Sequence, residues 1–123
     1  YLPKAVYAYL NNPLVQEELS FIPLATCFDY AANPIAYNPE ESWNEIVTRT
    51  FVGGASKHWR AIRTFCERVQ ESKRPPDRLR FPSIEVKALQ DALDYLKAHR
   101  QEKWAVEIRP WREQIERALR AQK

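Results

Sequence analysis

Few side chains of this sequence could act as catalytic or metal-binding groups. The 123 residues include two histidines, His58 and His99, and two cysteines, Cys27 and Cys66. His58 and Cys66 lie more than two helical turns apart, and neither has a third ligand nearby in sequence, so we expect no metal site. The spacing gives no support to a Cys–His nucleophile pair either. Because both cysteines sit among apolar residues, we expect buried free thiols.

Carboxylates and glycines narrow the possible chemistry further. The neighbouring acids Glu17–Glu18 and Glu40–Glu41 project about 100° apart on a helix, so they do not face each other as an acid–base pair would. The glycines are the adjacent Gly53 and Gly54, from which neither a GxGxxG fingerprint nor a P-loop can be written. We therefore expect no catalytic residue, no metal and no cofactor in this chain.

Positive charge gathers in the middle of the chain. The formal net charge is +3, and most of the excess of bases lies within residues 49–80, whereas residues 1–48 are acidic. The favoured interpretation is that the acidic first third faces the basic middle third inside one domain. The alternative is an independent helical protein-interaction or nucleic-acid-binding module that uses the basic region 57–80. Nucleic acid is the less expected partner, because no aromatic residue interrupts the bases of this region's last part to stack on a nucleotide. The candidate contacts of that module are Arg60, Arg63, Arg68, Lys73, Arg74, Arg78 and Arg80.

Apolar spacing predicts helices along the chain and no strand. Apolar residues recur at intervals of three and four, and alternation with a period of two is absent. This pattern indicates an all-α domain of about five helices, a bundle that takes in residues 1–123, with Trp59 and Trp111 as buried anchors. We expect an irregular segment over 1–13, then a helix from Leu14 to Asn33 with a kink at Pro23, then a second helix from an Asn38 cap to Gly53–Gly54. A third helix is expected over 56–72, and a Pro-rich basic loop over 73–82 follows it. Ser83 is expected to cap a fourth helix, and Pro110 is expected to start or kink a last helical segment over 104–119.

Two further observations concern what surrounds the chain. No run approaches 18 apolar residues, so we expect neither a transmembrane helix nor a membrane partner. The sequence contains no methionine, and we therefore expect it to be part of a longer protein.

Several short motifs resemble those of a known enzyme family. Asn-Pro-Leu at residues 12–14 leads into a helix, residues 29–34 read Asp-Tyr-Ala-Ala-Asn-Pro, and residues 37–43 read Tyr-Asn-Pro-Glu-Glu-Ser-Trp. Near the end, residues 106–111 read Val-Glu-Ile-Arg-Pro-Trp. In this order they resemble the β-N-acetylglucosaminidase and O-GlcNAcase family, which includes clostridial proteins long called hyaluronidases.

The resemblance implies that the chain is the helical domain that follows a catalytic barrel. In the family, two neighbouring aspartates of that barrel do the chemistry. One positions the substrate's own acetamido group for attack on the anomeric carbon, and the other is general acid and then base. No Asp-Asp pair occurs here, so the chain alone is expected to be non-catalytic. The implied partners are the upstream barrel and a glycan or glycoprotein that carries N-acetylglucosamine.

The resemblance also implies one substrate-binding residue, Asn12, as a ligand of a sugar hydroxyl. An amide suits this role because it offers both a donor and an acceptor. Four positions depart from the family pattern: Leu14 stands for Met, Phe21 for Lys and Ala32 for Trp, and Pro23 is unusual within the helix. The alternative is a purely structural role for Asn12, since Asn-Pro is also a common way to open a turn.

Overall fold

A computed structural model describes residues 17–51 and 55–123 of the chain. These residues form helices and no strand, so the predicted all-α class is confirmed. The irregular segment predicted over 1–13 and the helix stop predicted at Gly53–Gly54 lie outside the described residues. The helices are α2 (Glu17–Ala32), α3 (Pro39–Thr50), α4 (Ser56–Ser72), the short 3₁₀ helix η1 (Pro76–Arg78), α5 (Ser83–Ala98), α6 (Lys103–Glu107) and α7 (Arg109–Ala121).

The chain divides into two compact units, residues 1–53 and residues 54–123. The expectation of one domain over residues 1–123, with its acidic part facing its basic part, remains a prediction.

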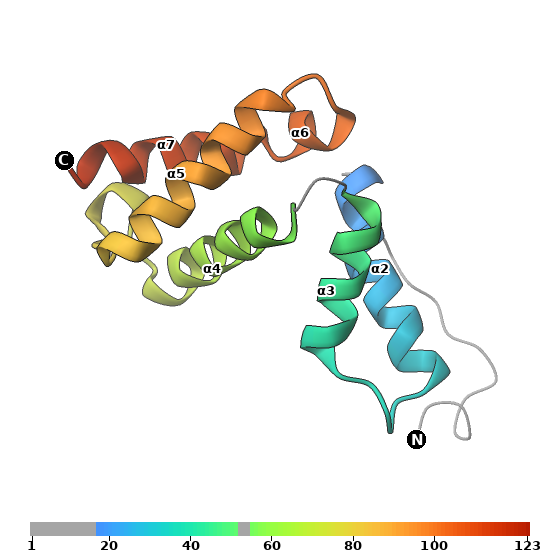
Figure 1. Ribbon diagram of the computed structural model, residues 1–123. Coiled ribbons are helices and arrows are strands. Elements are labelled where there is room, and N and C mark those ends of the chain that lie inside the picture. The colour runs from blue at the N-terminus through green and yellow to red at the C-terminus, as the bar shows by residue number, and fades with distance from the viewer. Residues whose placement is uncertain (1–16, 52–54) are drawn as a thin grey trace. The chain divides into compact units, whose positions relative to one another are not determined.

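In the first unit, α2 and α3 lie side by side (Figure 1). The start of α3 is as expected, because the Asn38 Oδ1 atom accepts the backbone N–H groups of Glu40 and Glu41 at 3.0 and 3.2 Å. Helix α2 runs through Pro23, and the N–H of the residue after its end still donates to the Asp29 carbonyl at 3.2 Å.

In the second unit, α5 packs against both α4 and α7 (Figure 1). The apolar faces predicted for these helices supply most of the buried side chains, and Trp59 is buried as expected. The buried apolar residues of this unit are Ala55, Trp59, Ile62, Phe65, Leu79, Leu89, Ala92, Leu93, Leu96, Ala105, Ile108, Ile115, Ala118 and Leu119.

Burial was predicted wrongly for Trp111 and Cys27, and Cys66 is only half-buried. Trp111 is only half-buried, with its ring edge-on to Phe65 at 6.5 Å between centroids. The physical reason is that α7 begins at Arg109, so Trp111 lies in the first turn and has neighbours on fewer sides. Cys27 is exposed, on a helix that is apolar on more than one side and only partly covered.

The last helical segment is two helices, which raises the number of α-helices among the described residues to six. Ile108 ends α6 and precedes α7, and its carbonyl accepts the N–H groups of Trp111 and Arg112 at 3.0 and 3.1 Å. Pro110 lies in the first turn of α7, where its missing N–H costs nothing. Of the two outcomes predicted for Pro110, the structure has the helix start.

The Pro-rich loop over 73–82 is held against the end of α7. The Gln122 side chain donates to the Leu79 carbonyl at 2.7 Å and accepts the Phe81 N–H at 3.2 Å. Ser83 is the first residue of α5 and not its cap, so this prediction was wrong. Pro82 occupies the cap position, because its ring fixes the backbone just before the helix. It makes no side-chain hydrogen bond to the helix.

An aromatic cluster joins α4, α5 and the start of α6. The rings of His58 and Trp104 stack on Tyr95 at centroid distances of 4.8 and 5.7 Å, and His99 approaches Tyr95 at 4.7 Å. Trp59 meets Trp104 edge-on at 5.4 Å. Both histidines of the chain therefore contact one tyrosine, a meeting that the spacing of His58 and His99 in the sequence does not predict.

Burial lowers the pKa of His58, with a further lowering from the charge of Lys57 and an opposing contribution from Asp91. Burial raises the pKa of Tyr95, and a hydrogen bond with the Trp59 side chain opposes that rise. The fold thus favours the neutral form of His58.

The lowered pKa of His58 predicts that the second unit loses stability in mild acid. A histidine whose folded pKa lies below its unfolded value of about 6.5 contributes its full stability above that pH, and the contribution falls as the pH drops below it. We expect the melting temperature to fall between about pH 7.5 and about pH 5.5. His58→Phe keeps a ring at the stack and should make this fall smaller, whereas Tyr95→Phe should leave it unchanged. An equal fall in wild type and His58→Phe would contradict the assignment.

Candidate functional site

The motif residues of the region 29–43 meet where α2 ends and α3 begins. Ser42 Oγ donates to Asp29 Oδ2 at 2.6 Å, across thirteen residues of sequence. Ser42 is buried, and its hydroxyl links the two helices of the unit. A hydrogen bond to a carboxylate is stronger than one between neutral groups, so this contact fixes the spacing between the helices.

The connection between the helices is built from the remaining motif residues. Asn33 Oδ1 accepts the Ala36 N–H at 3.4 Å, which closes the turn. The rings of Tyr30 and Tyr37 meet edge-on at 5.4 Å. With the Asn38 cap described above, these contacts show that residues 29–43 specify a helical hairpin.

A hollow of about 340 Å³ lies at this end of the hairpin. Three carboxylates, Asp29, Glu41 and Glu45, line it together with the two turn asparagines and Tyr37. Such oxygens can accept hydrogen bonds from hydroxyl groups. Because Asp29 is engaged with Ser42 and the amide oxygens hold backbone N–H groups, the hollow is organised by the turn itself.

The predicted sugar ligand Asn12 lies outside the described residues. Its role therefore stays a prediction.

The cysteines and other potential ligands do not assemble into a reactive site in the described part of the chain. Burial raises the pKa of the Cys66 thiol to about 12, so the thiol is protonated and a poor nucleophile near neutral pH. Across residues 17–51 and 55–123, no three His, Cys, Asp or Glu side chains gather where they could hold a metal ion. No described helix is both long enough and apolar enough to span a membrane.

Several cations of the basic region 57–80 have internal partners. Arg68 Nη2 pairs with Glu85 Oε1 at 2.8 Å, and Arg80 Nη1 donates to the Ala121 carbonyl at 2.6 Å. Arg63 pairs with Glu67 one turn along α4, at 2.9 Å. Because these three arginines already bind groups of their own unit, their presence does not support a nucleic-acid-binding surface.

Comparison with known proteins identifies the family. A family model for beta-N-acetylglucosaminidase matches residues 2–67, more than half of the chain. The chain belongs to the beta-N-acetylglucosaminidase family. Searches of curated proteins and of solved structures found no match to it.

The family match encloses the hairpin and Asn12. It therefore covers the Asp29–Ser42 bond and the Asn38 cap, which give the beta-N-acetylglucosaminidase hairpin its shape. The motif at residues 106–111 lies beyond the match. In the structure this motif forms the joint between α6 and α7, with Ile108 buried at its centre.

Loss of the Ser42 hydroxyl should loosen the hairpin. Ser42→Ala leaves Asp29 without its donor and should cost about 1–2 kcal/mol. Amide hydrogen exchange in α2 and α3 should then quicken about tenfold, while α5 and α7 stay unchanged. Thr48→Ala is the matched control, because this exposed hydroxyl bonds only to the Asn44 carbonyl within α3. Equal effects of the two variants would show that the Asp29–Ser42 bond does not hold the helices.

Proposed function

We propose that this chain is the helical region that follows the catalytic barrel of a retaining β-N-acetylglucosaminidase of the O-GlcNAcase-like kind. In this proposal the chain supports the barrel and contributes one sugar contact, Asn12, while the barrel supplies the catalytic aspartates. The parent enzyme acts on a glycan or glycoprotein that carries N-acetylglucosamine. The chain alone does no chemistry, because it has no neighbouring pair of aspartates.

The observation that carries the proposal is the exposed apolar side of α2 and its connection to α3. Phe21 and Phe28 are 54% and 58% exposed, and Ile35 is 78% exposed. A helix that is apolar around its circumference is normally buried, and clustered exposed apolar side chains mark an interaction surface. The proposed neighbour that covers these side chains is the catalytic barrel.

The second unit provides the contrast. Its helices are amphipathic: α7 turns Ile115 and Leu119 inward and carries charged residues such as Arg117 on its exposed side. A helix of this kind has its apolar surface buried once one face is covered. The first unit is different, because α3 covers only part of the apolar surface of α2.

The proposed contribution of Asn12 rests on its place before α2. Proline at position 13 disfavours a helical backbone at Asn12, so the amide would project from an extended segment and not along a helix. The Asp29–Ser42 bond supports this role indirectly, since it holds the helix that follows the segment. In the family chemistry the aspartate pair of the barrel acts through the substrate's acetamido group. Asn12 would bind a hydroxyl of the same sugar and fix its orientation.

The docking proposal predicts that Phe28 matters only beside the barrel. Phe28→Glu should change the melting temperature of the isolated chain little, because the ring is exposed there. In the full-length polypeptide it should lower the melting temperature by several degrees, because a charge is then buried in an interface. Ile84→Glu, at a 79% exposed position of the second unit, should have no effect in either. The isolated chain should hydrolyse no aryl N-acetylglucosaminide. Equal effects of Phe28→Glu in both proteins, or a full-length polypeptide without a barrel, would refute the proposal.

The sugar contact predicts a kinetic effect without a stability effect. In the intact enzyme, Asn12→Ala should lower kcat/KM about three- to a hundredfold through loss of a hydrogen bond to substrate. Asn11→Ala, the neighbouring position, is the matched control and should be nearly neutral. Wild-type kinetics in a folded Asn12→Ala enzyme would return Asn12 to the role of a turn residue.

A further inference from the structure

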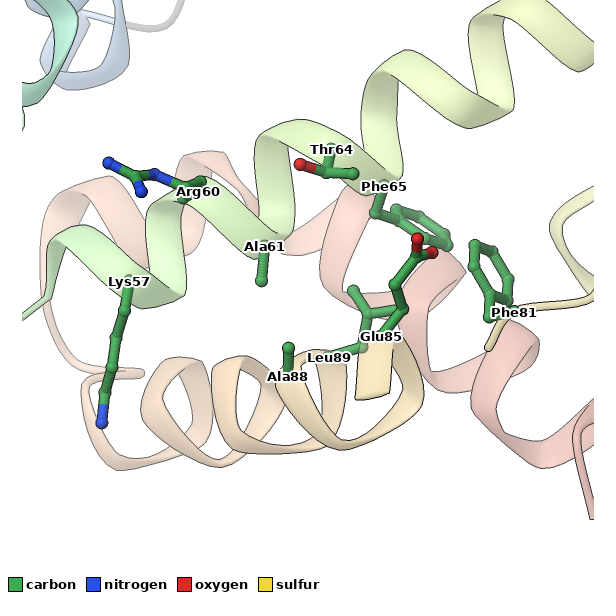
Figure 2. Close-up of a pocket in the computed structure, with 9 residues that line it drawn as sticks. All are labelled: Lys57, Arg60, Ala61, Thr64, Phe65, Phe81, Glu85, Ala88 and Leu89. Carbon is green, nitrogen blue, oxygen red and sulfur yellow. The ribbon is translucent and has the colours of Figure 1, made fainter. Parts of the chain in front are cut away.

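An apolar hollow of about 200 Å³ lies between α4 and α5 of the second unit (Figure 2). Ala61 points into it from α4 and Ala88 from α5, and the two methyl groups face each other across the space. Phe65, Phe81 and Leu89 line one end. The hollow therefore exists because two alanines stand where larger side chains would fill the contact between the helices.

The size of the hollow fits a small apolar group. The hollow is an open groove between the helices, since Ala88 is exposed and Ala61 is half-buried. An apolar cavity of about 150 Å³ is large enough to hold benzene. The hollow extends along α4 from Lys57 to Phe65, a rise of about 12 Å at 1.5 Å per residue. Its length and volume together suit a slender apolar body.

Charge distinguishes the two ends. Lys57 and Arg60 lie at the end away from the phenylalanines, both on the exposed surface of α4. The carboxylate at the opposite end, Glu85, is already paired with Arg68 at 2.8 Å. The Arg68 guanidinium also lies over the Phe81 ring, 5.3 Å from its centroid. Among the lining residues, the Lys57 end therefore carries cations, with the Asp91 carboxylate acting on the neighbouring His58, and the opposite end is neutralised and aromatic.

We propose that this hollow binds a small amphiphilic carboxylate, with its apolar body between Ala61 and Ala88 and its carboxylate at Lys57. The tail of such a ligand would contact Phe65 and Phe81, where burial of apolar surface supplies most of the affinity. Lys57 would supply orientation and the preference for an anion. This site goes beyond the glycosidase role and does not depend on it, because it lies wholly within the second unit.

The test is calorimetric titration of the 123-residue chain with sodium octanoate, compared with octylammonium chloride. We expect saturable one-to-one binding of octanoate and clearly weaker binding of octylammonium. Ala88→Leu fills the hollow and should weaken octanoate binding about tenfold or more. Ala98→Leu makes the same change at an exposed position of α5 outside the hollow and should leave the affinity unchanged.

The charged end has its own pair of variants. Lys57→Glu should weaken octanoate about threefold and strengthen octylammonium, whereas Lys87→Glu on the exposed side of α5 should do neither. Absence of saturable octanoate binding, equal affinity for the two head groups, or indifference to Ala88→Leu would each overturn the proposal. Circular dichroism of every variant separates loss of binding from loss of fold.

Discussion

The hydrogen bond between Ser42 and Asp29 is the constraint on which the first unit depends. Two short helices have little apolar surface to share, and much of what α2 carries stays exposed. A buried hydroxyl bonded to a carboxylate at 2.6 Å fixes the helices at one spacing, which apolar contacts alone do less specifically. The Asn38 cap and the Asn33 turn then set where α3 starts. The family motif thus specifies a helical hairpin, and part of the apolar surface of α2 stays exposed on it.

The second unit is held by a different principle. Its helices bury an apolar core, and at one end of the unit aromatic rings connect α4, α5 and α6. Tyr95 is the centre of this junction, because His58, His99 and Trp104 all contact it. The opposite end is closed by Gln122, whose amide satisfies backbone groups of the Pro-rich loop. These hydrogen bonds attach the loop with its adjacent prolines to the end of α7.

Local signals made most of the fold predictable. The Asn38 cap, the prolines and the apolar spacing act within a few residues, and they correctly gave the all-α class and the starts of α3 and α4. The break at Ile108 was less predictable, because the apolar spacing continues across it. The spacing of apolar residues did not predict that Cys27 is exposed, because α2 is apolar on several sides and its sequence does not indicate which side is covered. The pairing of Ser42 with Asp29 and the meeting of both histidines at Tyr95 depend on tertiary contacts that no spacing rule contains, although the Tyr95–His99 interval of one helical turn was a usable signal.

The bonds made by Gln122 also bear on the order in which the units fold during synthesis. The Ser42–Asp29 bond spans thirteen residues, so the hairpin can close soon after α3 is made. Arg80 and Leu79, by contrast, find their partners 41 and 43 residues later, at Ala121 and Gln122. Contacts between distant residues form late because the intervening chain must be ordered first. On the ribosome the second unit must therefore wait for its last helix, whereas the hairpin can close before that helix is made.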